Sequence, residues 1–121
     1  MYWGGEKMPG YVIKRNGDKY FFALYPTNSN SQTLGESILY TGEKECLKAL
    51  DDFKLLVKIN KIDSLISSNI SHEENEKMKY LDNEKNPVFY TRNKYSKNYK
   101  VNCNKTIKSI YRNIDSELKF E

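Results

Sequence analysis

The second half of this chain repeats the pattern of the first half, and this repetition limits the folds that the sequence can adopt. Residues 38–41 (Ile-Leu-Tyr-Thr) match residues 88–91 (Val-Phe-Tyr-Thr), fifty residues later. Two apolar sets at helical spacing also match, fifty-seven residues apart: Cys46, Leu50, Phe53 and Val57, and then Cys103, Ile107, Ile110 and Ile114. One such unit cannot bury a sheet face alone, whereas two units side by side can share one core.

The first unit contains the clearest local signals. Aromatic and β-branched residues at 11–15 and 19–25 flank Asn16-Gly17, which predicts two strands joined by a tight hairpin turn. A third strand is predicted at 37–41. From about residue 43 to 58 the apolar spacing changes to that of a helix, with Gly42 or Thr41 at its N-cap position.

The second unit is less clearly marked. After residue 58 the apolar positions fit either a continued helix or a short strand, and 67–76 is polar and linker-like. Strands are predicted at 78–81 and 87–91 around a turn at 82–86, followed by a polar loop at 92–100. The last element is an amphipathic helix whose predicted stripe extends from Cys103 to Ile114 and Leu118.

Together these elements predict an α+β fold of two tandem ββ(β)α units. The units share one mostly antiparallel sheet, with both helices on one face. The predicted organisation is one compact domain. It comprises a flexible N-terminal arm (1–8), a first repeat unit (9–66), a linker (67–76) and a second repeat unit (77–121).

The chain resembles the YegP-like family of small bacterial tandem-repeat domains. The similarity lies in residues 11–13 and 20–24, in 35–40, in the helix at 46–57, and in 107–113 near the end of the second helix. It covers about residues 9–118. The second unit departs from the family because it lacks an obvious first strand and an Asn-Gly turn, and the loop at 26–35 is longer than usual. The resemblance implies a fold of two β3α-type units and no established chemistry, so it supplies no catalytic residue.

The net positive charge of the chain lies in its second half. The 121 residues carry 20 Lys+Arg and 16 Asp+Glu, but residues 76–121 alone hold 11 basic and 6 acidic side chains. Much of this bias is lysine, which AT-rich coding also favours, so the charge is weak evidence for an anionic partner. No apolar run is long enough to span a bilayer, and no secretion signal is visible. The sequence therefore predicts a cytoplasmic protein with no membrane partner.

The residues that usually carry chemistry are few. His72 is the one histidine, and the linker-like sequence around it predicts an exposed side chain. Cys46 and Cys103 lie near the predicted helix starts, where a thiol can become reactive, but both belong to the apolar stripes and are expected to pack in the core. We therefore expect no enzyme, no metal and no cofactor.

Two binding functions remain. The first is a non-enzymatic protein-binding module, an adaptor or an inhibitor of a larger protein complex, as phage-encoded inhibitors of host systems are. The alternative is weak, sequence-independent nucleic-acid binding through the basic second half. A monomer is expected, with a homodimer as the alternative. The candidate binding residues are Trp3, Arg92, Lys94, Tyr95, Lys97, Tyr99, Lys100, Lys105, Lys108 and Arg112.

Overall fold

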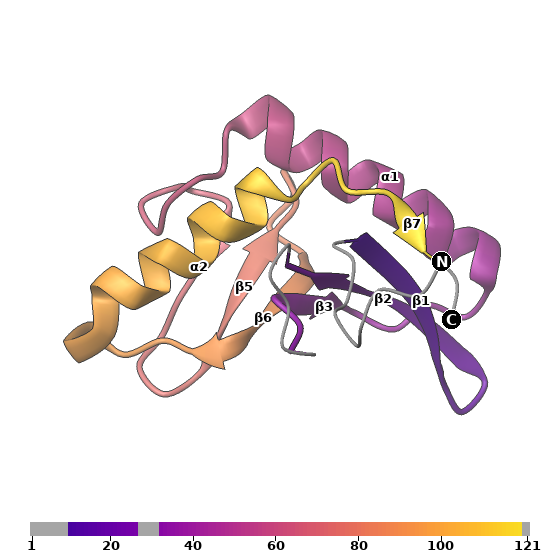
Figure 1. Cartoon of the computed structure of the whole chain (residues 1–121), viewed down its shortest axis with the longest axis horizontal. Helices are drawn as coiled ribbons and strands as arrows, with labels where there is room; N and C mark the ends of the chain where they lie inside the picture. Colours follow the sequence, from indigo (N-terminus) through magenta and orange to yellow (C-terminus); the bar gives the residue numbers. More distant parts are fainter. Residues whose placement is uncertain (1–9, 27–31, 120–121) are drawn as a thin grey trace, which may run out of the picture.

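The structure is a computed structural model that describes residues 10–26 and 32–119. Within these ranges the chain has an α+β fold of one seven-stranded mixed sheet and two α-helices (Figure 1). The strand order is β4-β5-β6-β3-β2-β1-β7. The predicted arm at residues 1–8, including Trp3, lies outside the described residues. The elements are β1 (Gly10–Asn16), β2 (Lys19–Tyr25), β3 (Gly35–Ser37), α1 (Glu43–Asn60), β4 (Ile70–Ser71), β5 (Lys77–Leu81), β6 (Pro87–Lys94), the 3-10 helix η1 (Lys97–Tyr99), α2 (Lys100–Arg112) and β7 (Leu118–Lys119).

The predicted hairpin is confirmed. β1 and β2 pair antiparallel from Gly10 opposite Tyr25 to Asn16 opposite Lys19. Gly17 has a φ of 66°, a conformation that glycine adopts without steric cost and that a tight hairpin turn requires. The hairpin thereby brings Tyr11, Phe22 and Leu24 into the core.

The third strand begins and ends earlier than predicted. β3 covers only Gly35–Ser37, and the chain then touches the sheet again at one bridge between Tyr20 and Tyr40. The Ser37 hydroxyl explains the early end, since it accepts a hydrogen bond from the Phe22 amide (2.9 Å) and donates one to the Ile38 carbonyl (2.8 Å). A side chain thus takes backbone partners that a longer strand would use.

The structure confirms the first predicted helix and shows the conformation of the residues that follow it. α1 continues to Asn60, and Lys61, with a φ of 49°, caps it in the left-handed conformation. Ile62 and Leu65 then lie buried in a loop, whereas Ile66 is exposed, so these residues form neither a continued helix nor a strand.

The second half contains a strand that the sequence did not reveal. The segment predicted as a linker, 67–76, includes β4, in which buried Ile70 pairs with Tyr80 of β5. The predicted loop at 92–100 is also largely ordered structure. β6 continues through Lys94, η1 follows, and α2 begins at Lys100.

The prediction that Leu118 continues the stripe of the last helix is wrong. α2 ends at Arg112, where the Asn113 side-chain amide donates to the Ser109 carbonyl (2.8 Å) and competes with the next helical turn. Ile114 remains in the core, but Leu118 belongs to β7, which pairs parallel with β1 opposite Tyr11. This parallel pair makes the sheet mixed.

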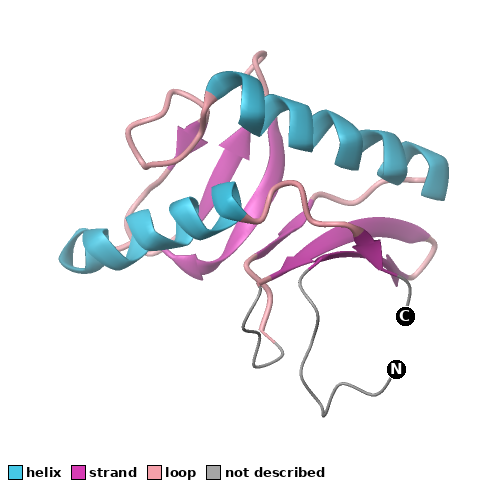
Figure 2. Cartoon of the chain, turned by 45° about the horizontal axis from the view of Figure 1, so that its top comes forward, coloured by secondary structure: helices cyan, strands magenta, loops and turns pink. Residues whose placement is uncertain are grey.

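Figure 2 shows both helices lying alongside the sheet. One hydrophobic core contains side chains from β1, β2, β4, β5, β6, α1 and α2. The buried stripes of α1 and α2 belong to the same cluster as sheet residues Phe22, Tyr80 and Phe89. Phe53 of α1 stacks on Phe89 with ring centroids 4.5 Å apart and meets Tyr80 edge-on at 5.4 Å. Across the described ranges, neither helix is long and apolar enough to cross a membrane.

Candidate functional site

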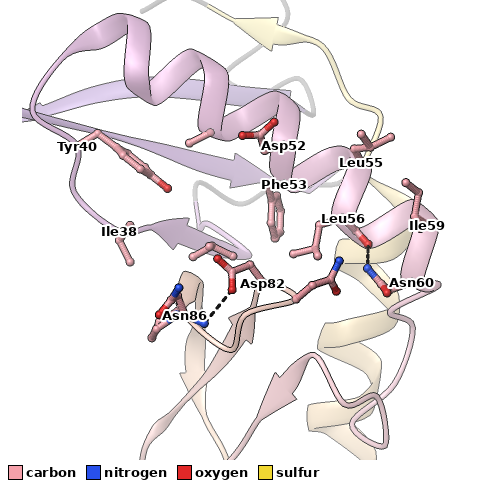
Figure 3. Close-up of a pocket in the computed structure, with 14 residues that line it drawn as sticks. Ile38, Tyr40, Asp52, Phe53, Leu55, Leu56, Ile59, Asn60, Asp82 and Asn86 are labelled. Atoms are coloured by element: carbon pink, nitrogen blue, oxygen red, sulfur yellow. Dashed lines mark hydrogen bonds between the residues drawn. The ribbon is translucent and has the colours of Figure 1, made fainter.

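A groove opens between one flank of α1, the segment after β3 and the turn between β5 and β6 (Figure 3). Its volume is about 510 Å³. We call it the α1 groove. Its lining residues are Ile38, Tyr40, Ala49, Asp52, Phe53, Leu55, Leu56, Ile59, Asn60, Asp82, Asn83, Asn86, Pro87 and Val88.

The apolar part of the α1 groove is open to solvent. Leu55 is 54% exposed and Ile59 is 68% exposed, one helical turn apart on α1. Both lie off the buried stripe of this helix. Half-buried Ile38 and Val88 also line the groove, and Val88 packs against the core. A contiguous apolar surface of this kind is typical of a site that binds another molecule.

Acidic groups lie at the same groove. Asp82 is held in place because its Oδ1 accepts hydrogen bonds from the Glu84 and Asn86 amides, both 2.9 Å long (Figure 3 shows the Asn86 contact). Asp52 projects from α1 and pairs with exposed Lys48 at 3.0 Å. Burial raises the pKa of Tyr40 to about 12, with further contributions from Cys46 and from these two carboxylates. The groove is therefore largely apolar, with two carboxylate groups among its lining residues.

A second surface carries part of the predicted basic set. Lys105, Lys108 and Arg112 are all exposed on α2, opposite its buried stripe, and we call them the α2 basic stripe. Lys97, Tyr99 and Lys100 are exposed at the start of this helix. Three ion pairs form within residues 10–26 and 32–119, and none of them uses a cation of the α2 basic stripe.

The other predicted residues lie elsewhere. Arg92 lines a separate polar hollow of about 370 Å³ on the sheet, together with Glu36, Lys77 and Tyr90. Lys94 ends β6 opposite Lys77. Tyr95 is half-buried and packs against His72, with ring centroids 4.5 Å apart. The α2 basic stripe and the exposed η1 residues thus lie on consecutive segments, whereas Arg92 lines the polar hollow and Tyr95 packs against His72.

The candidate chemical residues are packed into the fold. Cys46 and Cys103 are free and buried, as predicted from the apolar stripes. Burial raises the pKa of the Cys46 thiol to about 11, with a contribution from Glu43. His72 is half-buried against Tyr95, so the prediction of an exposed histidine is wrong. In the described part of the chain, no three His, Cys, Asp or Glu side chains gather where one metal ion could bind.

Comparison with solved structures identifies the fold. The solution NMR structure of a UPF0339 protein from Shewanella oneidensis matches with a TM-score of 0.69 and 15% identity, covering 94% of this chain and 92% of that one. The solution NMR structure of YegP from E. coli, a protein of unknown function, matches with a TM-score of 0.66 and 13% identity, covering 97% of each chain. The chain has the YegP-like fold. The resemblance inferred from sequence is thereby confirmed as a likeness of fold. No family model matches the chain, and no curated protein matches it.

The α1 groove was not predicted from the sequence. Its walls come from three segments, 38–40, 49–60 and 82–88, which only the YegP-like fold brings together. The available signal was in α1 itself, where Leu55 and Ile59 are apolar but do not belong to the stripe of Cys46, Leu50, Phe53 and Val57.

Proposed function

We propose that this protein is a non-enzymatic protein-binding module, an adaptor or an inhibitor of a larger protein complex, which acts as a monomer in the cytoplasm. The observation that carries the proposal is the α1 groove, where Leu55 and Ile59 expose apolar surface beside a hollow of about 510 Å³. Burial of such surface is the main favourable term in most protein association. Because the groove is open to solvent, a protein segment could enter it.

The absence of enzymatic activity is part of this proposal. The two thiols, which are the strongest nucleophile candidates, are buried, and the raised pKa of Cys46 keeps that thiol protonated near neutral pH. Because one fold can carry many functions, the proposed function rests on the groove and not on the YegP-like fold.

Nucleic-acid binding is the second candidate, favoured by the α2 basic stripe. Lys105, Lys108 and Arg112 present three exposed cations along one helix face, and Tyr99 is 65% exposed nearby in sequence. Such a surface attracts phosphates without reading sequence, and its affinity falls steeply with salt. We rank nucleic-acid binding second because Arg92 and Tyr95 have other surroundings, so the basic surface consists of fewer residues than the sequence predicts.

We also propose that the fold consists of two tandem β-β-β-α units with both helices on one face of the sheet. The strand order, in which β3 and β6 are central neighbours, supports this architecture. The Ile38 amide bonds to the Val88 carbonyl (3.3 Å), and these are the positions that the fifty-residue repeat makes equivalent. A local twofold axis between antiparallel strands places equivalent residues opposite each other. The single core that both helix stripes enter supports it further.

An affinity-capture experiment tests the proposed function. The tagged full chain is incubated with lysate of its own organism, with and without nuclease. Three forms are compared: the wild type, a groove variant (Leu55→Asp/Ile59→Asp) and a stripe variant (Lys105→Glu/Lys108→Glu/Arg112→Glu). We expect a nuclease-resistant protein partner that the stripe variant retains and the groove variant loses. Capture that nuclease or the stripe variant abolishes would instead support nucleic-acid binding.

A further inference from the structure

We propose that the α1 groove binds an amphipathic α-helix of a partner protein, with apolar residues on the docked face and lysine or arginine beside it. This inference rests on the proposed protein-binding function and adds the chemical class of the partner.

The walls of the α1 groove favour a helix over an extended segment. A peptide that binds as a strand gains its affinity by pairing with a free sheet edge. The sheet side of the groove consists of the first residues of β6, which already pairs with β5 and β3, and of residues 38–40. In that segment the Ile38 and Tyr40 amides already donate to backbone carbonyls of β6 and β2. The opposite wall is α1, whose backbone is bonded within the helix. A bound helix satisfies its own backbone, so it needs only side-chain contacts from these walls.

The spacing of groove residues on α1 also suits a helix. Ala49, Asp52, Leu56 and Ile59 follow one another at intervals of three or four residues along this flank, with Leu55 beside them. At 1.5 Å per residue the flank is about 15 Å long, which corresponds to roughly three turns of a partner helix. Apolar side chains at i, i+3 or i+4, and i+7 of the partner would lie against it.

The charge of the groove selects a basic partner. Asp52 and Asp82 come from opposite walls, and both influence the pKa of Tyr40, which lines the groove with them. The hydrogen bonds from the Glu84 and Asn86 amides hold the Asp82 carboxylate in place before any ligand arrives. Asp52 already pairs with Lys48, whereas no ion pair within residues 10–26 and 32–119 uses Asp82. Lysine or arginine beside the apolar face of the docked helix would pair with Asp82 and compete with Lys48 for Asp52, and charge complementarity favours such a partner over an acidic one.

A display selection tests the inference. A phage library of 14-residue helical peptides with random surface positions is selected on the immobilised full chain, and enriched peptides are measured by titration. We expect sequences with apolar residues at helical spacing and Lys or Arg beside them. Leu55→Asp/Ile59→Asp should weaken their binding at least tenfold, whereas Ile66→Asp should leave it unchanged. Ile66 is a matched control because it is 90% exposed and lies outside the groove.

A second variant pair isolates the charge. Asp52→Asn/Asp82→Asn should weaken binding about 2- to 30-fold at low salt, as expected for two surface ion pairs. Asn at 82 can still accept the hydrogen bonds of the turn, so the fold is preserved. Asp51→Asn is the control, because Asp51 is exposed on α1 but does not line the groove. Enrichment of acidic or strand-patterned peptides, binding that the groove variants do not weaken, or no enrichment would overturn the inference. If lysate capture through the groove persists in any of these cases, the proposed function stands and only the helical partner is excluded.

Discussion

Two buried tyrosines, Tyr11 and Tyr80, provide a matched test of the hydrogen bonding in this core. Both side chains are fully buried, but their hydroxyl groups differ. The Tyr11 hydroxyl donates to the Ile114 carbonyl at 2.8 Å. Within residues 10–26 and 32–119, the Tyr80 hydroxyl has no hydrogen-bond partner. Burial raises the pKa of both phenols, as expected for groups that cannot ionise in the core.

Replacing each tyrosine by phenylalanine should therefore change stability in opposite directions. Tyr80→Phe removes a buried polar atom and keeps the ring that contacts Phe53 and Phe89, so the free energy of unfolding should rise by about 1–3 kcal/mol. Tyr11→Phe leaves the Ile114 carbonyl without this donor, and it should lower the free energy of unfolding by about 1–3 kcal/mol.

Urea denaturation followed by circular dichroism measures both values, and thermal unfolding supplies an independent check. For a chain of this length, 1 kcal/mol corresponds to a shift of about 4 °C in Tm. A Tyr80→Phe protein that is less stable than wild type by 1 kcal/mol or more would refute the reasoning, because its hydroxyl would then have a favourable partner such as an ordered water.

Two further predictions concern the core. Phe53→Ala should lower the free energy of unfolding by about 3–5 kcal/mol in the same urea assay, because Phe53 is 2% exposed and stacks on Phe89; a loss below 1 kcal/mol would contradict its central place. Because burial raises the pKa of Cys46 from 9.0 to about 11, the thiol ionises more readily in the unfolded chain, so stability should fall as pH rises from 9 to 11. Cys46→Ala should reduce that fall, and an equal decline in both proteins would exclude the thiol as a contributor.

Local signals in the sequence were sufficient for the main elements of the YegP-like fold. The Asn-Gly turn fixed the first hairpin because its backbone preference acts within four residues. The apolar spacing predicts α1, and it also predicts that both cysteines lie in the core, where the structure has them. These predictions held because local preference and tertiary packing favour the same conformation.

The elements that were missed depend on distant partners. β4 has only two residues, too few to show the alternation of apolar and polar residues that marks a strand in a sequence. It forms because Ile70 pairs with Tyr80 on β5. β7 is equally short and forms because the Tyr11 amide donates to the Glu117 carbonyl (2.9 Å), more than a hundred residues away in sequence. β3 ended early because the hydroxyl of Ser37 replaced strand hydrogen bonds. A strand of two or three residues carries too little sequence to predict alone.

The exposed apolar part of the groove comes from residues of α1 that are not needed to build the core. The buried stripes, Cys46 to Val57 and Cys103 to Ile114, have equal length, yet α1 has 18 residues and α2 has 13. Leu55 and Ile59 add nothing to the core and leave apolar surface in water. Burying the exposed parts of these two side chains would contribute about 2–4 kcal/mol to binding. A micromolar complex needs about 8 kcal/mol, so these two contacts cannot hold a partner alone. The two groove carboxylates would add about 0.4–2 kcal/mol, as expected for two surface ion pairs. A partner that reaches micromolar affinity must therefore also fill the rest of the groove, so that most of its binding energy comes from contacts beyond Leu55, Ile59 and the carboxylates.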